Sequence, residues 1–359
     1  MSGLLAAFFS SFIATLLIIR YQHLHHRFSA DSDLSGPQKF HKNIVPRIGG
    51  VSIAIGLALA ISIKAWNRPD AITELTLLLC AIPTFVIGLT EDLTKKISVR
   101  KRLFFTAISA GLAIYYLQAH ITRLDIPIID VALALPLCGI IFTIFAITGL
   151  ANAYNIIDGF NGLASMVAII TLLAIAYIGF VFLDLTVIYL ALIMVGAILG
   201  FFIWNYPRGL IFLGDGGAYL IGFWIATLTI LLVSRHPEIS PWFALLINGY
   251  PILETMFTIY RRKIHQGKSP GHPDGIHFHT LIYRRILGAD LHENKWFSSN
   301  ARTAPYLWAL AGFSITPAVL WWNSTPILVA ACFLFVVIYV WLYARIVKFK
   351  TPRWLHLDF

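Results

Sequence analysis

The sequence predicts an all-α, polytopic integral membrane protein that forms one domain over residues 1–359, and three observations lead to this prediction. Hydrophobic residues make up 58% of the chain and charged residues 12%, against roughly a quarter charged in soluble domains. Apolar stretches long enough to cross about 30 Å of hydrocarbon recur along the whole chain. Lysine and arginine are concentrated in alternate connections between these stretches.

Eleven apolar segments are predicted to be membrane-spanning helices. The first could be taken for a signal peptide, but no basic residue precedes its apolar run, and Arg20 follows it. We therefore expect it to be retained as a span. In chain order the predicted helices cover residues 2–19, 48–66, 71–89, 103–118, 131–149, 163–182, 185–204, 211–232, 241–259, 304–322 and 325–344.

The net charge of +10 could indicate a nucleic-acid partner, but the positions of the cations favour a membrane. If the N-terminus lies outside, the inner connections hold 23 lysines and arginines and the outer ones hold 4. The positive-inside rule then places the C-terminus in the cytoplasm, and we expect no nucleic-acid partner. The active site is predicted on the inner loops, near residues 20–47, 90–102, 151–162, 205–210 and 260–303.

Four acidic residues lie where predicted spans meet the cytoplasm: Glu91, Asp92, Asp158 and Asp215. Acids near the hydrocarbon are costly, so they usually have a function. One such acid could simply pair with a nearby cation such as Arg102, but four on the same side favour a shared site. The acidic pair in GLTEDLTKK, with cations just downstream, combines metal ligands with the positive charge that phosphate oxygens require.

The segment NAYNIIDGFNGLA places Asn152, Asn155, Asp158 and Asn161 at steps of three residues. Neighbouring members at this spacing share one face of a helix. Helix capping is the alternative interpretation, but a cap needs only one such residue. We therefore expect these side chains to bind substrate, with Asp158 in a catalytic role.

In FLGDGGAYLIG, Asp215 stands among glycines at the start of a predicted span. Bare backbone there lets a diphosphate approach closely, and a helix N-terminus favours negative charge. A hard oxygen ligand in this setting suits Mg²⁺, with Mn²⁺ as the alternative ion. The other interpretation is a glycine-lined packing face that buries one acid.

Two basic segments complete the predicted site. HKNIVPRIGG places Lys42 and Arg47 at a cationic helix entrance suited to an anionic lipid head or a nucleotide phosphate. HPDGIHFHTLIYRR places His277 and His279 shortly before two arginines. The histidines could bind zinc, but the neighbouring cations favour contacts with phosphate.

Together these motifs resemble the polyprenyl-phosphate N-acetylhexosamine-1-phosphate transferases of glycosyltransferase family 4. This superfamily includes the bacterial enzyme that makes lipid I and the enzymes that start O-antigen and teichoic-acid synthesis. PRIGG, the acidic pair, NxxNxxDGxNGLA and FLGDxG occur in the family's order and spacing over about residues 41–285.

The resemblance implies roles for the acidic residues. Asp215 is similar to the family's magnesium ligand, and Glu91 and Asp92 occupy its paired-aspartate position near the carrier phosphate. We expect Asp92 to share the metal. Glu91 departs from the usual first aspartate, and Thr280 stands where many members have another histidine.

The resemblance also implies contacts with substrate. Asn155, Asp158 and Asn205 match positions of the nucleotide-sugar cleft. The remaining matches are Lys42 and Phe212 with positions around the uracil, Arg102 with a basic residue near the phosphates, and His277 and His279 with the family's histidine motif.

The function implied is transfer of an N-acetylhexosamine-1-phosphate from a UDP-sugar to undecaprenyl phosphate, with release of UMP. This reaction would be the first membrane step of a cell-surface glycan such as O-antigen, on the cytoplasmic face of a bacterial inner membrane. The rival hypothesis is a transporter with an Asn/Asp ion site, but such sites cluster near the bilayer midplane. The sequence leaves the oligomeric state open, and a homodimer is compatible with it.

Overall fold

The fold is known from a computed structural model, which describes residues 2–29, 45–68, 71–265, 267, 275–287 and 299–350. The regular elements in these ranges are helices. In chain order they are α1 (Ser2–Arg20), α2 (Gln22–Ser29), α3 (Gly49–Asn67), α4 (Ile72–Thr94), α5 (Val99–Leu117), α6 (Pro127–Leu133), α7 (Pro136–Ile157), α8 (Leu163–Val181), α9 (Leu185–Asn205), α10 (Gly214–Arg235), α11 (Pro241–Ile247), α12 (Gly249–Tyr260), η1 (Arg261–His265), α13 (Phe278–Ile282), η2 (Tyr283–Leu287), α14 (Ser299–Leu320) and α15 (Thr325–Val347).

The prediction of an all-α polytopic membrane protein is confirmed. Nine helices in the described ranges are long and apolar enough to cross a membrane: α1, α3, α4, α7, α8, α9, α10, α14 and α15. The predicted span at 241–259 is instead a pair of helices, α11 and α12, bent by 75° at Asn248. The span predicted at 103–118 is α5, whose first turn carries Arg100, Lys101 and Arg102.

Each of the eleven predicted segments thus corresponds to helix, and nine of them, or ten with the bent pair, are long and apolar enough to be spans in the part of the chain that the structure describes. Several predicted ends are wrong, because α4 continues to Thr94, α5 begins at Val99 and α7 continues to Ile157. Parts of the predicted loops 90–102 and 151–162 are therefore helical. Polar residues do not end a helix whose backbone has no other hydrogen-bond partners near the hydrocarbon.

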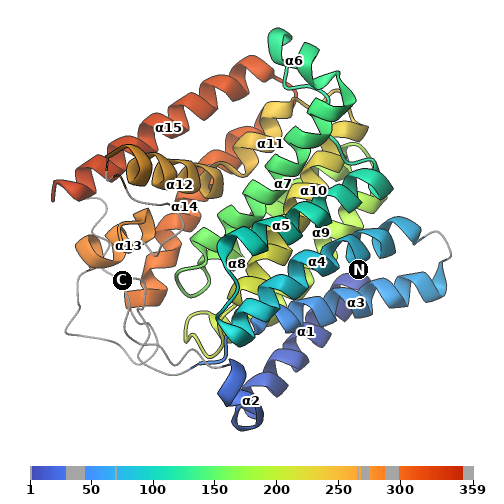
Figure 1. Cartoon of the computed structure of the whole chain (residues 1–359), viewed down its shortest axis with the longest axis vertical. Helices are drawn as coiled ribbons and strands as arrows, with labels where there is room; N and C mark the ends of the chain where they lie inside the picture. Colours follow the sequence, from blue (N-terminus) through green and yellow to red (C-terminus); the bar gives the residue numbers. More distant parts are fainter. Residues whose placement is uncertain are drawn as a thin grey trace.

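Helix α10 runs through the centre of the bundle, where α3, α4, α7, α8 and α9 surround it (Figure 1). All its residues from 214 to 232 are buried. Small residues allow this close packing: a Cβ on Gly50 would lie 2.3 Å from the Gly217 nitrogen, and a Cβ on Gly222 would lie 2.6 Å from the Ala151 Cα. Close packing of α10 therefore fixes the position of Asp215, which lies in the first turn of this helix.

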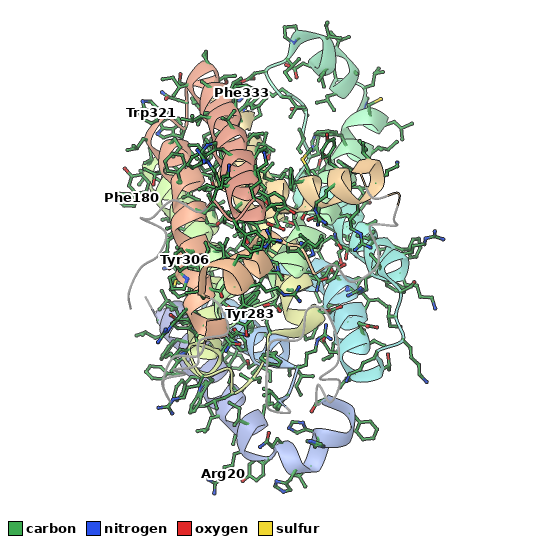
Figure 2. All side chains as sticks on the ribbon, turned by 90° about the vertical axis from the view of Figure 1, so that its left-hand side faces the viewer. Arg20, Phe180, Tyr283, Tyr306, Trp321 and Phe333 are labelled. Carbon is green, nitrogen blue, oxygen red and sulfur yellow. The ribbon has the colours of Figure 1, made fainter. Side chains whose placement is uncertain are left out.

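The outer surface of the bundle is apolar. Phe180, labelled at the left edge in Figure 2, and Phe333, labelled near the top on α15, expose 64% and 72% of their surface. Side chains of this size face the hydrocarbon in a membrane protein, since lipid tails are as apolar as they are. A smaller set of polar side chains, among them Asp92, Asn205 and Asp215, is buried inside the bundle.

The two ends of the bundle are distinct. Helices α2, at the bottom of Figure 1, and α13, at its left, lie toward one end, and α6, at the upper right, lies at the opposite end. The first end also holds the start of α10 and the ends of α4 and α7. We call it the site end, because the acidic and amide residues of the sequence motifs meet there.

Candidate active site

The start of α10 is fixed by backbone hydrogen bonds with the first two residues of α3 and with Pro46 just before that helix. Gly49 N–H donates to the Phe212 carbonyl and Gly50 N–H to the Leu213 carbonyl, each at 2.9 Å, and Phe212 N–H donates to Pro46. Gly214 has φ +78°, a conformation that favours glycine. These bonds bring Arg47 beside the first turn of α10.

Asp92 caps the N-terminus of α10. Its two carboxylate oxygens accept hydrogen bonds from the N–H groups of Asp215 and Gly216, both at 2.8 Å. A buried carboxylate at this position satisfies donors that the helix leaves unpaired. A Cβ on Gly214 would lie only 2.6 Å from Asp92 Oδ2, so the glycine makes room for the cap.

Asp215 itself is surrounded by donors from three other segments. Its Oδ1 accepts from Arg47 Nη2 at 2.5 Å and from Asn155 Nδ2 at 3.0 Å. Arg102 forms an ion pair with Oδ2, and Arg47 also lies 3.3 Å from Asp92 Oδ1 through its Nε. The structure thus brings together five residues of the predicted site, Arg47, Asp92, Arg102, Asn155 and Asp215, and their roles in binding and catalysis stay predictions.

Asn152 reaches Arg102 indirectly, through Tyr219. Its amide oxygen accepts a hydrogen bond of 2.8 Å from the hydroxyl of Tyr219, and the Arg102 guanidinium lies 5.6 Å from the centre of the Tyr219 ring. Tyr219 therefore packs against Arg102 and is itself held by Asn152. Sequence reasoning missed this buried tyrosine, although it stands one helical turn after Asp215 on the same face.

Asp158 follows the last residue of α7 and is only partly exposed. Burial raises its pKa to about 7, although the nearby Arg47 guanidinium opposes the shift. Glu91 has a different environment, since its Oε2 accepts from Ile97 N–H at 2.5 Å and closes the turn between α4 and α5. Lys95 in that turn has φ 54°.

Asn161 and Asn205 connect loops at the site end. Asn205 accepts from Gly162 N–H at 2.6 Å and donates to the Ile211 carbonyl at 2.7 Å, so both ends of its amide bind protein. Asn161 donates to the Pro207 carbonyl at 3.2 Å and, through its backbone N–H, to Asn300 at 2.9 Å. Their predicted contacts with substrate, and that of Phe212, stay predictions.

The two motif histidines lie beside the loop that follows α7. The ring of His279 packs edge-on against Phe160 at 5.3 Å, and its Nε2 would lie 3.0 Å from a Cβ on Gly159. The ring of His277 stacks on His279 at 5.1 Å. Lys42, His272 and Asp274 lie outside the described residues, so the predicted role of Lys42 stays a prediction.

The donor set suits some metals and not others. The described part of the chain contains no group of three or more His, Cys, Asp or Glu side chains arranged to hold a metal ion, which gives the zinc interpretation no support there. Asp215 Oδ2 is buried and accepts no hydrogen bond, only the ion pair with Arg102. One or two carboxylates, completed by phosphate oxygens and water, are what Mg²⁺ commonly uses. The residues present therefore fit a Mg²⁺ whose ligands come partly from Asp215 and partly from the substrate.

Comparison with known proteins gives a consistent picture. The family model for glycosyl transferase family 4 matches residues 75–233. The chain is 30% identical over 257 residues to a probable undecaprenyl-phosphate N-acetylglucosaminyl 1-phosphate transferase of Bacillus subtilis (strain 168), covering 70% of this chain and 69% of that protein. It is 28% identical over 254 residues to the undecaprenyl-phosphate alpha-N-acetylglucosaminyl 1-phosphate transferase of Thermotoga maritima, covering 71% and 73%. The protein of that same name in Escherichia coli (strain K12) is 30% identical over 255 residues, covering 69% and 67%.

Proposed function

Because this chain belongs to the polyprenyl-phosphate N-acetylhexosamine-1-phosphate transferase superfamily, in glycosyl transferase family 4, we propose that it transfers a sugar-1-phosphate to undecaprenyl phosphate. The donor is a UDP-N-acetylhexosamine, and the products are a polyprenyl-diphosphate sugar and UMP. The names of the relatives support N-acetylglucosamine as the sugar. The observation that carries the proposal is the convergence of Arg47, Arg102 and Asn155 on the buried Asp215.

This geometry suits a reaction between two anions. The carrier phosphate oxygen attacks the β-phosphorus of the donor, and the bond from that phosphorus to the oxygen bridging it to UMP breaks. Negative charge collects on the departing UMP, so catalysis of this kind rests on positioning and charge neutralisation. Arg47, which contacts Asp92 and Asp215, and Arg102, which contacts Asp215, are the cations we expect to contact the phosphate oxygens.

Mg²⁺ is the ion we propose for this site, held by Asp215 and by phosphate oxygens of the substrates. When bound, it supplies Lewis-acid stabilisation of the negative charge that develops on the leaving group. Asp92 contributes mainly by orientation, because both of its oxygens already accept N–H groups of the α10 N-terminus. Asp92 would bind the metal through the lone pairs of its carboxylate oxygens that accept no N–H group.

The reaction needs little help from a general base. A phosphate monoester has a second pKa near ~6, so the carrier phosphate is mostly dianionic at neutral pH. Asp158 and Glu91 are then more useful for orienting reactants than for taking a proton. The protein's own work at this step is to bring two repelling anions into line and to hold them there.

We place the site end at the cytoplasmic face of the bacterial inner membrane, with the N-terminus outside. Four described cations, Lys64, Arg68, Arg123 and Arg235, belong to the opposite end. Other described cations, including Arg47 and Arg102, lie at the site end. The positive-inside rule therefore favours an orientation in which the site end faces the cytoplasm. Cytoplasmic UDP-sugar would reach Asp215 directly.

A further part of the proposal concerns which glycan is built on the lipid-linked product. The PDGxHxH form of the segment that ends in His279 resembles the branch that starts O-antigen, and we propose a cell-surface glycan of that kind. The transporter alternative is less favoured, because Asp92, Asn155 and Asp215 all stand at helix ends rather than at mid-span.

Purified protein in nanodiscs tests the reaction. It should release UMP when given undecaprenyl phosphate, Mg²⁺ and UDP-N-acetylglucosamine, and should release none when the lipid or the metal is left out. A panel of UDP-sugars then identifies the preferred donor. Release that is indifferent to the lipid would contradict the proposal.

An exchange experiment tests whether attack is direct. Labelled UMP should not enter the UDP-sugar pool in the absence of carrier lipid, because no covalent enzyme intermediate forms in the direct reaction. Exchange without lipid would instead indicate a carboxylate nucleophile such as Asp92.

A further inference from the structure

Glu254 is a fully buried carboxylate that the proposed reaction does not use. It lies on α12, the second helix of the bent pair, and only 1% of its surface is exposed. Its Oε1 lies 3.0 Å from His277 Nδ1 and accepts from Phe278 N–H at 3.2 Å. Its Oε2 accepts from the Tyr339 hydroxyl of α15 at 2.7 Å.

These contacts determine where a proton sits on His277. An ionised carboxylate can only accept hydrogen bonds, so the Nδ1 atom that faces Glu254 carries a proton. The Thr258 hydroxyl, 3.2 Å from the same nitrogen, can accept as well. The other ring nitrogen is then the one left to act on substrate, and the ring orientation is fixed by the buried acid.

The same contacts reach the candidate active site. His277 stacks on His279 at 5.1 Å, and His279 packs against Phe160, two residues after Asp158. Tyr283, on the same segment and labelled in Figure 2, lies 5.5 Å from the Phe160 ring. A continuous set of contacts therefore runs from α15 through Glu254 and the histidines to the loop after α7.

Stability alone is a poor explanation for this arrangement. Burying a charge is costly, and packed hydrophobic residues of similar volume often replace a buried ion pair at no loss of stability. Ionisable residues inside a membrane protein usually mark function instead. The histidine segment also needs external support, since α13 and η2 together span only Phe278–Leu287 and a helix of that length is marginal alone.

We infer that Glu254 is a positioning residue for donor binding: it holds His277 with its proton on Nδ1 and thereby sets the stacked His277 and His279 rings against the loop at 158–160. Tyr339 fixes the second carboxylate oxygen and so ties α15 to the same segment. The inference rests on the proposed function, because it assumes that the histidines contact the UDP-sugar.

Binding of UDP-N-acetylglucosamine, measured by calorimetry on protein in nanodiscs, tests this inference without turnover. Glu254→Gln keeps the size of the side chain but removes its charge, and we expect the dissociation constant to rise about tenfold, as for other carboxylates that orient a functional histidine. Tyr339→Phe, which leaves the His277 contact in place, should give a smaller rise. Asp184→Asn, at the opposite end, should give none.

A double-mutant cycle separates positioning from general structural damage. If Glu254 acts through His277, Glu254→Gln combined with His277→Gln should weaken donor binding no more than His277→Gln alone. Additive losses would overturn the inference, as would an unchanged dissociation constant for Glu254→Gln. A wild-type protein that binds UDP-sugar but transfers nothing would contradict the proposed function and leave the binding result to decide the role of Glu254. A wild-type protein that binds no UDP-sugar would overturn both.

Discussion

The two ends of the bundle use the same kinds of charged residue in different ways. At the end opposite the site, acids and cations join helix ends and loops in separate pairs: Asp184 caps α9 through Val187 N–H at 3.0 Å and lies 3.2 Å from Arg235 and 3.3 Å from His236. At the site end, Arg47, Arg102 and Asn155 converge on one carboxylate from distant parts of the chain.

A second tie at the opposite end shows the same pattern. Arg123 lies 2.8 Å from Asp125 and donates to the Ile239 carbonyl at 2.9 Å, and the Thr325 hydroxyl donates to Asp125 at 2.5 Å. Each group there binds neighbouring loops together. The comparison indicates that convergence of two arginines and an amide on one carboxylate distinguishes the candidate reaction site from the structural ties, in which each acid binds a single arginine.

The largest effect is expected from removing the central charge. Asp215→Asn keeps the shape of the side chain but lowers its affinity for both metal and arginine, so we expect transfer to fall roughly 1,000-fold. The melting temperature should fall as well, because Arg47 and Arg102 lose a buried ionised partner, so the rate is compared per folded molecule. UMP release and a melting curve measure the two effects, and a variant that keeps a tenth of wild-type activity would remove Asp215 from its proposed role.

Asp92 should affect both stability and activity. Asp92→Ala leaves two buried N–H groups of α10 without acceptors, at a cost of about 1–3 kcal/mol for each. We also expect transfer to fall roughly 100-fold, because the first turn of α10 orients Asp215. Asp92→Asn, which keeps one accepting oxygen, should lie between this variant and wild type in both measurements. An active, stable Asp92→Ala protein would contradict the capping role.

Close packing of α3 on α10 can be tested with a matched pair of glycines. Gly50→Ala places a Cβ 2.3 Å from the Gly217 nitrogen, whereas a Cβ on Gly149 would meet nothing within 4 Å. We expect Gly50→Ala to destabilise the protein by about 1–3 kcal/mol and to reduce transfer, because it moves the helix start that carries Asp215. Gly149→Ala should match wild type in both assays.

The smallest effect is expected at the opposite end. Burial raises the pKa of Asp184, but the Val187 N–H and Arg235 outweigh it and hold the pKa below its usual value. The ionised form is therefore favoured by folding, so its stabilisation is present above the unfolded pKa of about 3.9 and is lost as the pH falls through the lower folded value.

Asp184→Asn should therefore cost about 1–2 kcal/mol of stability at pH 7 and leave the rate of transfer per folded molecule unchanged. Melting curves at pH 7 and at successively lower pH measure the first effect. A loss of transfer without a loss of folded protein would show that the two ends are not as distinct as we describe.

Much of the fold follows from the sequence, because hydrocarbon thickness sets the length of an apolar segment. The helix at 163–182 was predicted within a residue of α8, whereas α7 was predicted to end at 149 and continues to Ile157. Its last turns carry Asn152 and Asn155, and polar composition alone does not show that the backbone stays helical there. The break at Asn248 was missed because both halves of that segment are apolar.

The site was predicted in part for a similar reason. Asp215, Asn155 and the acidic pair stand out because polar residues are rare beside long apolar runs. Tyr219, Glu254 and Tyr339 were missed as parts of the site, because a tyrosine or a single acid in an apolar helix is usually explained by packing or pairing. Their roles depend on partners such as Asn152 and His277, which only the folded chain brings into contact.

The central claim is that sugar-1-phosphate transfer takes place at the end of the bundle that holds Asp215, and that this end faces the cytoplasm. Sealed membrane vesicles test it directly, because UDP-sugar does not cross a bilayer unaided. Inside-out vesicles given external UDP-N-acetylglucosamine and Mg²⁺ should release UMP at once, and right-side-out vesicles should do so only after permeabilisation. Equal activity in intact right-side-out vesicles would contradict the account.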